Sequence, residues 1–143
     1  MSRYRTSCRM KNYYQDSYDY RTGGIILMRN KVLEYAKIKY GAQPFFLWER
    51  DPESGVLKHK KNNKWYALFM RIPGNYVGLD TDEIVDIMNI KANPDMVASL
   101  SSQKGFAPAY HMNKTHWLSV ILNGVVTLES VYLLLDESYD LTK

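Results

Sequence analysis

The chain has 143 residues, of which 45% are hydrophobic and 24% are charged, and its formal net charge is +4. These values are typical of one soluble globular domain, and no apolar run approaches the roughly 18 residues that a membrane span needs. The single cysteine, Cys8, excludes an internal disulfide and leaves the rest of the chain without thiolate nucleophiles, Cys-ligated zinc or iron–sulfur clusters. The apolar run at 25–28 is too short for a signal peptide, so we expect a cytoplasmic protein.

Residues 1–27 differ in composition from the rest of the chain. They hold five of the twelve tyrosines, and five Lys or Arg side chains against two Asp, which is a net charge of +3. Residues 28–143 carry 14 basic and 13 acidic side chains, so most of the basicity lies outside them. Without aliphatic residues before Ile25, the first segment cannot bury enough apolar area to offset its ordering entropy. We expect a flexible Arg/Tyr-rich extension at 1–27, which could also stack on bases, and one domain at 28–143.

The first half of this domain begins with a helix and continues as strands. Apolar residues at a spacing of three to five predict a helix over 28–40, and Gly41 is a typical stop signal. The aromatic stretch at 44–50 predicts a strand. The two stretches 56–61 and 64–72 flank Asn62 and Asn63, which predicts a tight hairpin because Asn tolerates the left-handed backbone of such turns.

The second half contains two strands and two helices. A strand is predicted over 83–93, and the sequence Asn93-Pro94-Asp95 then gives a helix start, with Asn as the N-cap and Pro at the first helical position. Residues 106–116 are expected to form a loop and 117–122 a strand, and Thr127 is expected to cap a last helix. The order α-β-β-β-β-α-β-α predicts a two-layer α+β sandwich of an antiparallel sheet with N- and C-terminal helices.

Residues with catalytic or metal-binding chemistry are sparse in this pattern. His111 and His116 lie five apart, and no Cys or acid lies between Asp95 and Glu129 to complete a zinc site. The serines lack a glycine-flanked elbow, and no glycine-rich phosphate loop is present. We therefore predict a non-enzymatic protein without catalytic residues, metal ligands or a cofactor.

The predicted hairpin is the strongest candidate for binding. Four lysines gather around its turn, next to Trp65 and Tyr66, and such a hairpin could neutralise several phosphates: Lys58, Lys60, Lys61 and Lys64. Lysines on an edge hairpin can instead prevent aggregation, and this alternative stays open. The polar corner at 109–117 has the same two interpretations, since its groups either satisfy one another or face a ligand.

Three stretches resemble the MmcQ/YjbR family of small bacterial proteins: GFAPAYHMNKTHWLSVILNG at 105–124, NIKANPDMVASL at 89–100 and NKWYALFMRIP at 63–73. The resemblance extends over about residues 28–143, and Ala92 departs from it, because relatives often carry cysteine there. It implies a CyaY-like (frataxin-like) fold and DNA binding through β-hairpin wings. By position, that role would fall on the four hairpin lysines and on His111, Asn113, Lys114 and His116.

The resemblance also leaves alternatives. A frataxin-like fold suggests iron binding, but the first helix here is basic, whereas frataxins use an acidic one. A second alternative is a protein- or small-ligand-binding module that uses Tyr110, His111 and Trp117. We expect a monomer with no membrane contact and with DNA as its partner.

Overall fold

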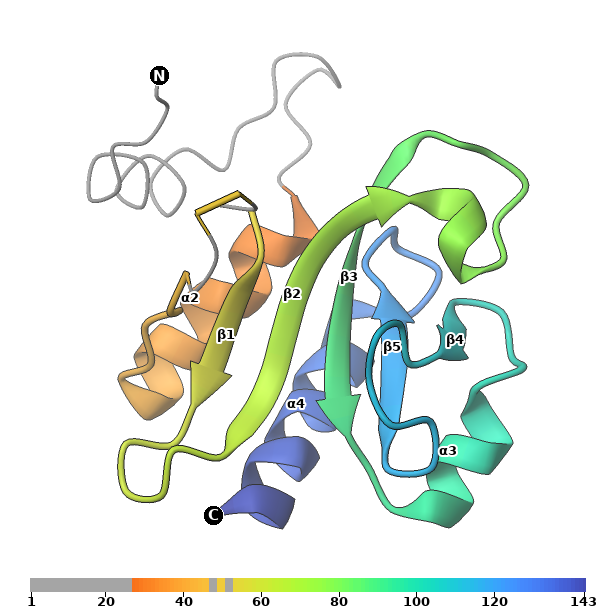
Figure 1. Cartoon of the computed structure of the whole chain (residues 1–143). Coiled ribbons are helices and arrows are strands. Elements are labelled where there is room, and N and C mark those ends of the chain that lie inside the picture. The colour runs from red at the N-terminus through yellow and green to blue at the C-terminus, as the bar shows by residue number, and fades with distance from the viewer. Residues whose placement is uncertain (1–26, 47–48, 51–52) are drawn as a thin grey trace. The chain divides into compact units, whose positions relative to one another are not determined.

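The computed structural model describes residues 27–46, 49–50 and 53–143 (Figure 1). The extension predicted over 1–27 therefore lies, except for its last residue, outside the described residues. The chain divides into two compact units, Met1–Gln43 and Pro44–Lys143.

The described part of the first unit is the helix α2 (Met28–Tyr40), in agreement with the prediction. It ends where Gly41 adopts a left-handed backbone with φ of 65° and donates its N–H to the carbonyls of the last turn. Glycine takes this conformation without a steric penalty, which is why the stop could be identified from the sequence alone.

The second unit contains a five-stranded antiparallel sheet in the order β1-β2-β3-β5-β4. Its strands are β1 (Gly55–Lys58), β2 (Trp65–Pro73), β3 (Ile84–Lys91), β4 (Phe106–Pro108) and β5 (Trp117–Ile121). A 3-10 helix η2 (Gly74–Val77) follows β2, and α3 (Pro94–Leu100) connects β3 to β4. The last helix α4 (Leu128–Thr142) packs on β2 and β3 and buries Val131, Leu134, Leu135 and Ser138. The predicted α+β class with an antiparallel sheet is confirmed.

The helix starts also agree with the sequence. The Asn93 side chain accepts from the backbone N–H of Asp95, and Pro94 occupies the first position of α3. Thr127 likewise accepts from the N–H of Ser130 at the start of α4. Both caps use a side chain within three residues of the N–H that it satisfies, so neither depends on distant contacts.

Three predicted elements differ from the structure. The predicted strand at 44–50 is wrong at its described residues, where only Phe45 forms an isolated bridge with Val56. The loop predicted over 106–116 begins with the short edge strand β4. The hairpin exists, but its turn is not the tight pair Asn62-Asn63, because β1 ends at Lys58 and residues 59–64 form a wider loop. The observed order is therefore α-β-β-β-α-β-β-α.

Candidate nucleic-acid interface

The two predicted binding segments lie at the same end of the sheet. β3 is antiparallel to both β2 and β5, so the loops that precede β2 and β5 are on one side (Figure 1). Ala67, Ile90 and Leu118 are successive partners across these strands, and the N–H of Ala92 bonds to the carbonyl of His116 at 3.0 Å. Two strand spacings, about 10 Å, separate the starts of β2 and β5. The fold thus brings the hairpin loop 59–64 and the loop 109–116 to one end, which we call the basic end.

The hairpin loop 59–64 is held by the C-terminal part of α4. His59 is buried, and its Nε2 lies 2.8 Å from Thr142 Oγ1 and 3.0 Å from the Tyr139 carbonyl. Asn62 Nδ2 donates to the carbonyl of Thr142 at 3.0 Å, while its Oδ1 accepts from the N–H of Lys64. Asn63 adopts a left-handed backbone with φ of 61°. These contacts join the wide turn to the last residues of α4.

The four hairpin lysines are not equivalent. Lys60, Lys61 and Lys64 are exposed on the loop. Lys58 is the last residue of β1 and is half-buried, with its Nζ 4.5 Å from the centre of the Phe45 ring. A cation over an aromatic face at this distance is attracted to it. Among the residues that the structure describes, Lys60, Lys61 and Lys64 are thus exposed to a phosphate, whereas Lys58 contacts an aromatic ring.

Asn113 shapes the loop before β5. Its Oδ1 accepts from the N–H groups of Thr115 and His116, at 2.9 and 3.0 Å. Its carbonyl accepts from the N–H of Trp117 at 3.1 Å. The acceptor oxygen of Asn113 thus serves the turn, whereas the neighbouring Lys114 and His116 side chains are exposed.

A buried polar network, which the sequence analysis missed, fixes the start of this loop. Asn89 and Ser119 face each other as register partners on β3 and β5, and the Ser119 hydroxyl donates to Asn89 Oδ1. Ser119 Oγ accepts from the N–H of Tyr110 at 3.0 Å, and Asn89 Nδ2 donates to the Tyr110 carbonyl at 2.8 Å. The signal in the sequence was a polar residue, Asn89 or Ser119, inside each of two largely apolar stretches, but the pairing of the two residues depends on the strand register.

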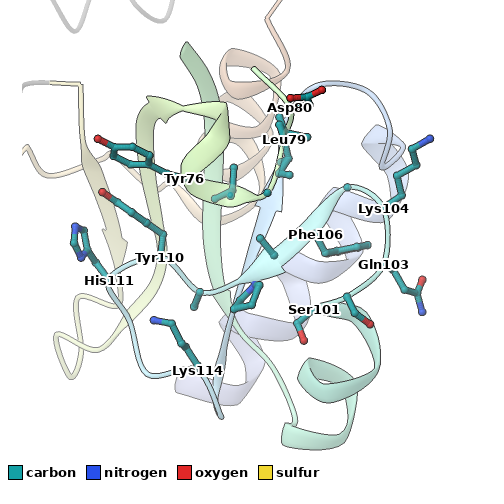
Figure 2. Close-up of a pocket in the computed structure, with 18 residues that line it drawn as sticks. Tyr76, Leu79, Asp80, Ser101, Gln103, Lys104, Phe106, Tyr110, His111 and Lys114 are labelled. Carbon is teal, nitrogen blue, oxygen red and sulfur yellow. The ribbon is translucent and has the colours of Figure 1, made fainter. Parts of the chain in front are cut away.

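A pocket of about 750 Å³ borders this loop (Figure 2). Its aromatic side contains Tyr76, Tyr110 and His111, and its charged side chains are Lys104, Lys114 and Asp80. Two of the eight predicted binding residues, His111 and Lys114, line it. Trp117, which the small-ligand alternative placed there, is not among the lining residues, and Tyr76 and Lys104 were not identified from the sequence.

Neither a metal-binding cluster nor a membrane-spanning helix is present within residues 27–46, 49–50 and 53–143. No three His, Cys, Asp or Glu side chains of this part are placed to hold a metal ion. No helix in the same ranges has the length and apolar character that crossing a membrane requires.

Comparisons with known proteins identify the family. Residues 38–141 match the YjbR family. Protein YyaQ of Bacillus subtilis strain 168, described as uncharacterized, is 36% identical over 118 residues, which cover 82% of this chain and 100% of YyaQ. Protein YjbR of Escherichia coli K12, also described as uncharacterized, is 34% identical over 112 residues, covering 77% of this chain and 82% of YjbR.

Solved structures share the fold. A crystal structure of a Pseudomonas syringae protein has a TM-score of 0.78 at 41% identity, covering 80% of this chain and 98% of that one. A Deinococcus radiodurans protein has a TM-score of 0.53 at 28% identity, covering 70% and 67%. The family match, the identities to two bacterial relatives and the shared fold lead to one conclusion: the chain belongs to the YjbR family.

Proposed function

We propose that this protein binds DNA through the basic end of its sheet, with Lys60, Lys61, Lys64 and Lys114 contacting phosphates. The observation that carries the proposal is that exposed lysines from two separate segments occur at one end of the sheet, on loops held by buried hydrogen bonds. Lysine neutralises phosphate as a point charge, and each contact adds affinity by releasing counterions. Phosphate contacts carry no sequence information, so we expect binding that tolerates sequence changes.

The position of the lysines favours this function over protection of a sheet edge. An edge-protecting lysine interrupts the exposed strand itself. In β1 this description fits Lys58 alone, whereas Lys60, Lys61 and Lys64 lie beyond the end of the strand. We further propose that the protein acts as a non-enzymatic monomer in the cytoplasm.

The test is fluorescence anisotropy of the full-length protein with labelled duplex DNA, over a series from about 50 to 200 mM salt. The variant replaces Lys60, Lys61 and Lys64 with Gln. For B-DNA the slope of log affinity against log salt changes by about 0.9 for each phosphate contact, so losing three contacts should flatten it by roughly 2.7.

Two control variants distinguish the loss of positive charge at the hairpin from the loss of positive charge elsewhere in the chain. The variant Arg3→Gln, Arg5→Gln, Arg9→Gln removes the same number of charges from the N-terminal segment, and Lys60→Arg, Lys61→Arg, Lys64→Arg keeps the charges at the hairpin. Both should retain the wild-type slope. Absence of wild-type binding at the lowest salt, or equal loss in both charge-removing variants, would refute hairpin-mediated binding.

The second candidate function is a small-ligand-binding module, favoured by the pocket beside Tyr110 and His111. A ligand-dependent rise in melting temperature without any response to DNA would support this function over the first.

A further inference from the structure

Three aromatic rings follow one another along one side of the pocket (Figure 2). The ring centres of Tyr76 and Tyr110 are 5.8 Å apart with an angle of 32° between their planes, and those of Tyr110 and His111 are 4.0 Å apart. Tyr76 is 55% exposed, so much of its ring is open to a ligand. An aromatic ring with an open face can stack with an unpaired nucleobase, because every base has a flat π-surface.

The main chain of two of these three residues, Tyr110 and His111, is held in place without any ligand. Tyr110 is bonded at both its N–H and its carbonyl by Ser119 and Asn89, which are completely buried. His111 adopts a left-handed backbone with φ of 61°, which few non-glycine residues adopt. Non-glycine residues in this region cluster at ligand sites, where the surrounding structure enforces them. The aromatic wall formed by Tyr76, Tyr110 and His111 therefore loses little main-chain entropy at Tyr110 and His111 when a base stacks on it.

The pocket does not suit an added peptide strand, although β4 is an edge of the sheet. The N–H of Phe106 already donates to the carbonyl of Gln103 at 3.1 Å. Pro108, the alternate position on the same edge, has no N–H to offer. A peptide that binds by strand addition relies on such main-chain donors, so side-chain recognition is the better use of this surface.

The charged side chains of the pocket indicate that its ligand also carries a negative group. Lys104 and Lys114 line the pocket against one acid, Asp80, which favours an anion. Lys114 also belongs to the basic end, so the pocket shares a residue with the surface that we propose contacts phosphates. The volume of about 750 Å³ lies in the range of sites for small molecules, roughly 300 to 1,000 Å³.

We propose that this pocket holds one unpaired nucleotide, with its base on the Tyr76–Tyr110–His111 wall and its phosphate at Lys114. The inference rests on the proposed DNA binding and specifies it: the preferred partner is DNA with an unpaired base. The same chemistry could come from a free nucleotide, and the experiment separates the two sources.

The test measures full-length protein with a fully paired duplex, with the same duplex carrying one bulged adenine, and with adenosine monophosphate alone. We expect the bulged duplex to bind more tightly than the paired one. Tyr76→Leu should weaken binding to the bulged duplex by about ten-fold, because it removes one aromatic platform for base stacking. Tyr76→Phe keeps the ring and should retain the preference. The Gln variant of Lys60, Lys61 and Lys64 should weaken both duplexes equally.

The outcomes separate the two proposals. Equal affinity for both duplexes, with Tyr76→Leu without effect, overturns the nucleotide pocket and leaves DNA binding intact. Saturable binding of adenosine monophosphate that Tyr76→Leu abolishes, without binding to either duplex, overturns DNA binding and identifies the pocket's ligand as a free nucleotide. Absence of binding to all three probes overturns both.

Discussion

Ser138 joins the last helix to two strands next to the basic end. It is completely buried, and its hydroxyl donates to the Tyr66 carbonyl at 2.6 Å and accepts from the N–H of Lys91 at 2.9 Å. The register of β1 and β2 shifts next to the Tyr66 carbonyl. Leu57 pairs with Ala67 and Lys58 with Trp65, which places Tyr66 at a bulge of β2. The Ser138 hydroxyl thus forms hydrogen bonds both to the bulge of β2 and to the last residue of β3.

Replacing Ser138 with Ala should destabilise the protein by about 2 to 4 kcal/mol. The substitution removes this partner from the Tyr66 carbonyl, in a buried contact, and from the Lys91 N–H, in a partly buried one. The first loss costs roughly 1 to 3 kcal/mol and the second about 1 kcal/mol. That is a large part of the roughly 5 to 15 kcal/mol that holds a domain together. Alanine has the higher helix propensity, so the backbone of α4 does not oppose the change.

Urea unfolding followed by tryptophan fluorescence measures this effect. With a slope of about 2 kcal/mol per molar urea, the midpoint should fall by roughly 1 to 2 M while the slope stays constant. Ser99→Ala, an exposed position on α3, is the matched control and should stay within about 0.5 kcal/mol of wild type. A loss below about 0.5 kcal/mol for Ser138→Ala would refute the bridging role.

Two further predictions concern the same end of the domain. Burial, with the nearby Tyr139 phenol, raises the pKa of Tyr66 above its ordinary value of 10.0, so the folded state holds this proton more tightly. The contribution of Tyr66 to the free energy of unfolding is complete below pH 10 and is lost as the pH rises further, by at most about 1.4 kcal/mol per pH unit. Denaturant titrations above pH 10 should therefore show a shallower decline of this free energy with pH for Tyr66→Phe than for wild type. Asn113→Ala removes the acceptor of two N–H groups and should cost about 1 kcal/mol, by analogy with a lost N-cap, measured by thermal melting; an unchanged melting temperature would contradict the turn's role.

The helix ends and the strand-rich middle could be predicted from the sequence. Gly41, Asn93 and Thr127 act on backbone groups of their own turns, so their effects depend only on neighbouring residues. The long strands β2 and β3 were identified because they are rich in aromatic and β-branched residues. β4 was missed because three residues carry too little pattern, and it exists as a strand only through pairing with β5.

The candidate site could be predicted in part. The lysine cluster and the polar corner were visible as residue types, the first around a predicted hairpin turn and the second mostly in a predicted loop. What the sequence determined by itself is therefore this local chemistry, together with the family and the α+β class. Only the tertiary structure decided that the two loops share one end of the sheet, that His59 contacts Thr142 on α4, and that Tyr76 lies next to Tyr110 at a pocket. The physical reason is that these contacts join residues far apart in the chain, and their geometry comes from strand register and packing, which local patterns do not encode.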